Sequence, residues 1–69
     1  MNMQTYTANG VTVTYPVGYR AVQDYAVVLR LNLAQLQQRP PRFFTPARVA
    51  QLITRYKADI ALCKAAGIV

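Results

Sequence analysis

Histidine and glutamate are absent from this chain of 69 residues, and cysteine occurs only once. Histidine is the usual general acid or base of an enzyme, so its absence removes the commonest catalytic group. The only carboxylates are Asp24 and Asp59, and one cysteine with two aspartates cannot supply the ligands of a structural zinc ion. The three glycines are isolated, so they form no glycine-rich phosphate loop. We therefore expect no catalytic residue, no cofactor, no metal site and no small-molecule substrate.

Charge is absent from the first nineteen residues, and all ten charged side chains lie between Arg20 and Lys64. Eight of the ten are positive, which gives a net charge of +6. Such an excess favours an acidic partner, such as nucleic acid, an anionic membrane or an acidic protein surface. The simpler interpretation, that the charge only keeps an apolar chain in solution, stays open at this point.

Long apolar runs and cross-links are lacking too. The longest apolar stretches, such as Ala26–Leu29, are far shorter than the roughly 20 residues of a membrane-spanning helix. Residues 1–7 have neither the basic nor the apolar region of a signal peptide, so we expect a protein that is not secreted by that route. Cys63 has no partner for a disulfide within the chain, and a lone thiol favours a reducing compartment.

The size of the chain limits its core. We expect one small domain over residues 1–69, and chains of this length bury only about 60% of their unfolded surface. Charged residues make up 14%, against about a quarter in typical domains, while apolar residues make up 54%. Small proteins without disulfides or metals usually depend on oligomerisation, so we expect protein partners or a larger assembly.

The first element that the sequence predicts is a β-hairpin over residues 4–15. Asn9-Gly10 stands between two β-favouring runs and suits a type I′ turn, which pairs Ala8 with Val11 and Gln4 with Tyr15. Alternation then sorts the side chains into an apolar face and a threonine face. The apolar face is expected to contain Tyr6, Ala8, Val11, Val13 and Tyr15, and the other face Thr5, Thr7, Thr12 and Thr14.

The edges of this hairpin have no protection against pairing. Natural sheet edges are shielded by lysine, proline or inward-pointing charge, and this segment has no charge at all. Strand addition supplies main-chain hydrogen bonds across such an edge. The alternative is that the apolar face simply packs on the helices of the same chain, which would leave the edges open.

Residues 19–38 are expected to form the first helix. Apolar residues at helical spacing share one stripe, while Val27, Val28 and Leu31 fall outside it and predict a helix covered on several sides. The stripe consists of Val22, Tyr25, Ala26, Leu29, Leu33 and Leu36. Alternation over residues 29–33 also fits a strand, but about twenty residues without a turn signal favour the helix.

A linker over residues 39–44 and a second helix over residues 46–66 follow. Pro40-Pro41 enforces an extended stretch. Thr45 suits the N-cap of the helix, and Pro46 suits its first position. Gly67 suits the left-handed position that follows the helix. The expected core stripe is Val49, Leu52, Ile53, Tyr56, Ile60 and Cys63, which makes Cys63 an inert core residue.

The opposite side of the second helix carries small residues. Alanine is a good helix former, so propensity alone accounts for them, but small side chains also let another helix approach closely. The stripe comprises Ala47, Ala50, Thr54, Ala58, Ala61 and Ala65. Arg48 and Arg55 flank the core stripe on one side, with Lys57 and Lys64 on the other. A helix-turn-helix interpretation is weakened by the long connector and by the lack of a base-reading set on the alanine side.

The segment Thr5–Tyr15, followed directly by a helix from about Tyr19, resembles the hairpin-then-helix unit of small phage head-to-tail joining proteins of the lambda W type. The resemblance covers residues 4–38, and it implies a small component of a virion that assembles in rings between capsid and tail. The second helix and the Pro-Pro linker have no counterpart in that unit. The resemblance assigns no functional residue.

We therefore expect an α+β fold in which an N-terminal two-stranded hairpin packs on an antiparallel pair of helices. The expected function is that of a non-enzymatic assembly protein, most plausibly a phage head, neck or tail component in the virion or the host cytoplasm. Expected subunit contacts are Thr5, Tyr6, Thr7, Thr12, Val13, Thr14, Tyr15, Ala50, Thr54, Ala58 and Ala61. The alternative is a small nucleic-acid-binding or regulatory protein. Expected contacts with nucleic acid or an acidic partner are Arg39, Arg42, Arg48, Arg55, Lys57 and Lys64. A membrane partner is not expected.

Overall fold

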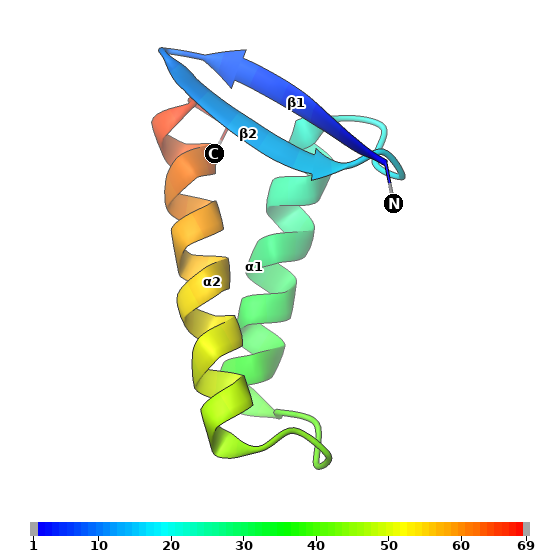
Figure 1. Ribbon diagram of the computed structural model, residues 1–69, viewed down its shortest axis with the longest axis vertical. Helices are drawn as coiled ribbons and strands as arrows, with labels where there is room; N and C mark the ends of the chain where they lie inside the picture. The colour runs from blue at the N-terminus through cyan, green and yellow to red at the C-terminus, as the bar shows by residue number, and fades with distance from the viewer. Residues whose placement is uncertain (1, 69) are drawn as a thin grey trace.

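The computed structural model describes residues 2–68 and contains two strands followed by two helices (Figure 1). Strand β1 spans Met3–Ala8 and β2 spans Val11–Pro16, while helix α1 spans Val22–Gln38 and α2 spans Pro46–Ala65. The antiparallel strands lie across one end of the helix pair. This arrangement confirms the α+β fold predicted from the sequence.

The ribbon of β1 and β2 has the register that the Asn9-Gly10 turn predicts. Asn9 and Gly10 both have positive φ angles, 54° and 74°, as a type I′ turn requires. Ala8 pairs with Val11 and Gln4 with Tyr15. The amide of Val17 also donates to the carbonyl of Asn2 at 3.2 Å, which extends the pairing beyond both strands.

Helix α1 begins at Val22, three residues later than the sequence pattern predicts. The segment before it is held on the ribbon, because the side-chain amide of Gln4 donates to the carbonyls of Pro16 at 3.3 Å and Tyr19 at 3.2 Å. Ala21 is extended at the N-cap and offers no side-chain cap. The segment with strand-like alternation, residues 29–33, is helical as predicted.

Helix α2 has the ends that its sequence predicts. The hydroxyl of Thr45 accepts a hydrogen bond from the Arg48 amide at 3.1 Å, and Pro46 occupies the first turn. At the other end Gly67 adopts a φ of 77°, and the Ile68 amide donates to the Cys63 carbonyl at 2.9 Å. This closing bond is the Schellman motif, and it turns Ile68 back into the core, where 6% of it is exposed.

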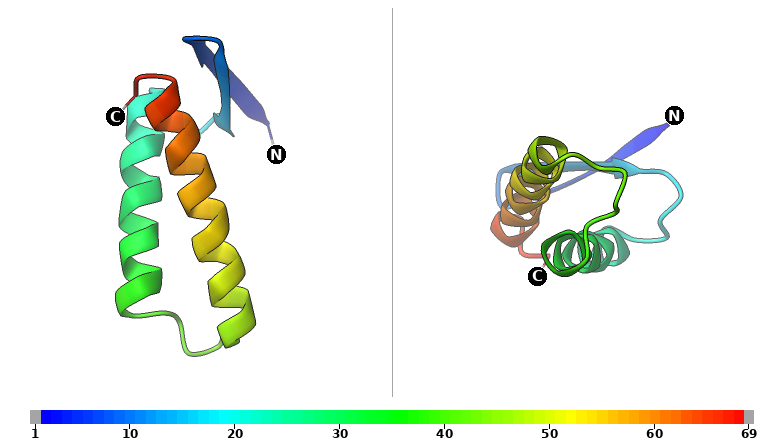
Figure 2. Two further views of the ribbon diagram at one scale, coloured as in Figure 1. Left: turned by 90° about the vertical axis from the view of Figure 1, so that its left-hand side faces the viewer. Right: turned by 90° about the horizontal axis from the view of Figure 1, so that it is seen from below.

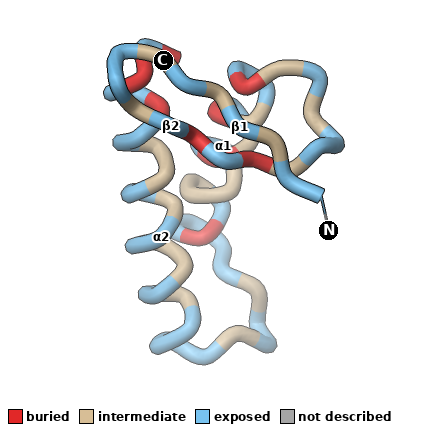
Figure 3. Tube along the Cα trace, turned by 45° about the horizontal axis from the view of Figure 1, so that its top comes forward, coloured by how far each residue is buried: buried red, intermediate tan, exposed pale blue. Residues whose placement is uncertain are grey.

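The core lies where the ribbon crosses the helices (Figure 3). β2 supplies the two buried residues of the ribbon, Val13 and Tyr15, while β1 has none. Tyr15 stacks on Tyr25 of α1 with ring centroids 5.7 Å apart. The whole buried cluster is Val13, Tyr15, Val22, Ala26, Leu29, Cys63, Ala66 and Ile68.

The molecule is more open than a compact monomer of its size. Its radius of gyration is 12.8 Å, whereas about 11 Å is typical for 69 residues. Its accessible surface is 5083 Å², against about 4,300 Å² from the scaling for compact monomers. Figure 2 shows why, since the ribbon projects to one side and leaves most of the length of the helix pair uncovered.

Candidate functional site

The threonine side chains of the β1–β2 ribbon are exposed to solvent, whereas its aromatic face packs on the helices of the same chain. Thr5, Thr7, Thr12 and Thr14 are all exposed. Of the other expected contacts here, Val13 is 3% exposed and Tyr15 7%, and Tyr6 packs against the same buried cluster. Those three side chains therefore serve the core of this chain, whereas the threonines, Met3 and the strand edges are open to a neighbour.

The edge of β1 presents main-chain groups that β2 does not use. In an antiparallel pair, every second cross-strand pair exchanges both hydrogen bonds, and the pairs between them point their main-chain groups outward. The turn closes at Ala8 and Val11, so the outward set includes Thr5 and Thr7 on β1. The close approach of the Thr7 and Thr12 hydroxyls, 2.9 Å apart, fits a pair of this outward type.

The small-residue stripe of α2 faces away from α1 and the ribbon. Ala50, Thr54, Ala58 and Ala61 are exposed. The hydroxyl of Thr54 donates to the Ala50 carbonyl at 3.1 Å, so its donor is already used within the helix. The stripe is accordingly a smooth, weakly polar surface, beside which Leu62 is 45% exposed.

The six expected basic contacts do not form one surface. Arg39 and Arg48 border a hollow between α1 and α2, and Arg55 borders the hollow next to it. Arg42 borders a third hollow, which is lined largely by prolines and apolar side chains of α2. Lys57 and Lys64 lie on the other flank of α2, because they are nine residues on from Arg48 and Arg55, or two and a half turns.

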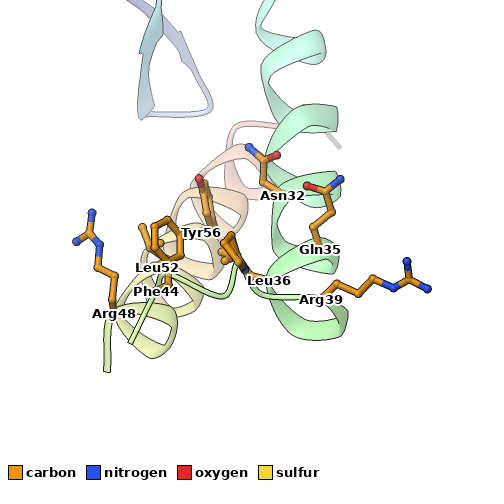
Figure 4. A pocket seen from close by; sticks show the side chains of 9 residues that line it. Asn32, Gln35, Leu36, Arg39, Phe44, Arg48, Leu52 and Tyr56 are labelled. Carbon is orange, nitrogen blue, oxygen red and sulfur yellow. The ribbon is translucent and has the colours of Figure 1, made fainter. Parts of the chain in front are cut away.

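The first two hollows form one groove, which we call the basic groove. Their volumes are about 340 and 310 Å³, and they share Asn32, Leu52 and Tyr56. Leu36, Phe44 and Leu52 give the lower part an apolar floor, while Arg39 and Arg48 project on its two sides (Figure 4). Tyr19, Tyr25 and Asp59 border the upper part, toward the ribbon.

Sequence reasoning found the arginines of this groove but missed its amides. Asn32 and Gln35 project from α1 beside the groove, where the apolar stripe predicted only core residues nearby (Figure 4). The sequence feature that could have revealed the groove is Asn32. This polar residue interrupts a run of apolar residues, on the helix face that the pattern assigns to the interior. Tyr25 was assigned to the core, and it both packs there and borders the groove.

Two side chains near the upper end of the groove, the Tyr25 phenol and the Cys63 thiol, have raised pKa values. Burial raises the pKa of the Tyr25 phenol above its ordinary 10.0, the Asp59 carboxylate raises it further, and Arg55 lowers it. Burial and then Asp59 also raise the pKa of the Cys63 thiol above 9.0, against an opposing effect of Arg30. Cys63 is 2% exposed, so the neutral thiol packs as a small apolar group.

These shifts predict that the chain loses stability in alkali. A folded-state pKa above the unfolded one stabilises the fold at low pH, and that contribution falls as pH rises through the unfolded and then the folded pKa. Urea unfolding followed by circular dichroism is expected to show a free energy of unfolding that falls from about pH 9 upward, since the unfolded chain loses its thiol proton near the ordinary pKa of 9.0 and its phenol proton near 10.0. Tyr25→Phe is expected to flatten the later part of the decline. A stability that stays constant to about pH 11 would contradict this assignment.

Within residues 2–68, no three histidine, cysteine or acidic side chains come together in a way that could hold a metal ion. Neither helix in this described part of the chain combines the length and the apolar character needed to cross a membrane.

Comparisons with protein-family models, with curated proteins and with solved structures found no match to this chain.

Proposed function

We propose that this chain is a non-enzymatic structural subunit of a larger assembly, joined to neighbouring subunits by strand addition at the edge of β1. The observation that carries the proposal is the open edge itself. Thr5 and Thr7 direct main-chain groups away from β2, and the strand contains neither charge nor proline to prevent pairing. A two-stranded ribbon alone is only marginally stable, so a third strand would reinforce it.

The uncovered apolar side chains support an assembly role. Val27 and Leu31 are one turn apart on α1 and are 54% and 60% exposed, and Phe43 in the linker is 83% exposed. The alanine stripe of α2 offers a second weakly polar face that another helix could approach closely. Exposed apolar surface of this kind is typical of sites that a partner covers.

We place this assembly in a phage particle, in the head, neck or tail. The support is the resemblance of residues 4–38 to the hairpin-then-helix unit of lambda W-type joining proteins. The charge distribution is compatible with tight packing of subunits, because the strand edge that would pair is neutral while the positive charges lie on the helices and loops.

Sedimentation velocity of the purified chain at micromolar concentration tests the proposal. The expected result is an oligomer whose population grows with concentration. A soluble monomer that melts cooperatively at the same concentration would overturn it, because such a chain would be stable without binding another subunit.

A further inference from the structure

We propose that the basic groove between α1 and α2 binds an acidic, extended peptide segment of a partner protein other than this chain. The proposal concerns a different surface from the edge of β1.

The groove has the length and the floor that an extended peptide needs. From Arg48 to Asp59 along α2 is eleven residues, or about 16 Å of helix axis. An extended segment rises about 3.3 Å per residue, so about five residues fill this length. Leu36, Leu52 and Phe44 can receive apolar side chains, while Asn32 and Gln35 present amides suited to main-chain groups (Figure 4).

The arginines of the groove are suited to carboxylates, with Arg39 and Arg48 at the lower part and Arg55 at the upper part beside Asp59. Arg39 comes from the end of α1, and Arg48 and Arg55 stand two turns apart on α2, about 10 Å along the axis. All three side chains are exposed, and a guanidinium group matches a carboxylate with two parallel hydrogen bonds. Acidic side chains two or four residues apart share one face of an extended segment, at about 7 or 13 Å, and these spacings bracket the distance between Arg48 and Arg55 along the helix.

The upper part of the groove argues against nucleic acid. Asp59 borders it, and a phosphate backbone running the length of the groove would bring repeated negative charge to this carboxylate. The sequence of a peptide sets where its charges lie. A peptide can therefore place acidic residues opposite the arginines and a neutral or basic residue opposite Asp59. The change of sign along the groove therefore favours a peptide over a polyanion.

A second copy of this chain does not fit the groove. It has only Asp24 and Asp59 to offer as carboxylates, 35 residues apart, and its net charge of +6 is repelled by the same arginines. The occupant is therefore a different protein that has at least two acidic residues within one short segment.

A matched pair of double variants tests the proposal. Arg48→Gln with Arg55→Gln removes two charges from the groove, and Lys57→Gln with Lys64→Gln removes two charges from the other flank of the same helix. Both sets of side chains are exposed, and circular dichroism checks that each variant stays folded. The probes are a fluorescent peptide of alternating glutamate and leucine, its lysine-for-glutamate counterpart, and a single-stranded oligothymidylate, measured by fluorescence anisotropy at fixed salt.

The wild-type chain is expected to bind the glutamate peptide and to discriminate against the lysine peptide. The groove variant is expected to lose about tenfold or more in affinity for it, because charge-assisted hydrogen bonds are removed, and the flank variant less than about twofold. Equal losses in the two variants, absence of binding to the glutamate peptide, or tighter binding of the oligothymidylate would each overturn the proposal. Both variants change only residues of α2 and none of β1, so assembly at the edge of β1 affects the two alike and their difference reports on the groove.

Discussion

Leu29→Ala is expected to remove a large share of the free energy of unfolding of the isolated chain. Leu29 is 3% exposed and lies in the cluster where the ribbon crosses the helices. Truncating a buried leucine to alanine costs about 2–5 kcal/mol. The whole free energy of unfolding of 69 residues is on the order of 3–10 kcal/mol, so this single change removes a large share of it.

Urea unfolding monitored by circular dichroism measures this loss, and Leu31→Ala is the matched control. Leu31 lies on the same helix but is 60% exposed, so its truncation is expected to change the free energy of unfolding by about 0.5 kcal/mol or less. At a concentration where the chain sediments as a monomer, similar losses in the two variants would contradict the burial of Leu29 and the exposure of Leu31 described above.

Thr5→Lys with Thr7→Lys is expected to abolish assembly of the chain while leaving its fold intact. Both threonines are exposed on the edge strand, so lysine can extend into solvent there without entering the core. Lysine at a strand edge opposes the approach of another strand, above all from a chain that is itself positive. Sedimentation velocity is expected to shift from oligomer to monomer at equal concentration.

The control for this variant adds the same charge elsewhere. Gln37→Lys with Gln51→Lys places two lysines on exposed positions of α1 and α2, away from the ribbon. This control is expected to sediment like the wild-type chain. Loss of assembly in both variants would assign the effect to net charge, and assembly of the edge variant would exclude β1 as the contact.

Local chemistry accounts for the parts of the fold that the sequence predicted. Asn9-Gly10 fixes the turn and therefore the register, and Thr45-Pro46 fixes the start of α2, since each depends on only a few adjacent residues. The start of α1 was misjudged because it depends on a distant residue. Gln4, fifteen residues before Tyr19, holds that segment against the ribbon, and no local propensity reports such a bond.

The candidate site was predictable in part for the same reason. The positions of Arg48 and Arg55 on one flank of α2, and of Lys57 and Lys64 on the other, follow from helical spacing alone. Arg39 and Arg42 looked like one cluster around two prolines, but the path of the linker sends them to separate hollows. The groove itself arises from how the two helices pack, which spacing within either helix does not describe.

The uneven placement of the core has a consequence for motion. Eight of the buried residues cluster at the ribbon end, while Leu36 is the buried residue near the linker. Amide hydrogen exchange is therefore expected to be slowest around Leu29 and Cys63 and to quicken in the turns next to the linker, where local opening costs less. Those turns carry Arg39 and Arg48, so the lower half of the groove can adjust to an occupant while the ribbon end stays fixed.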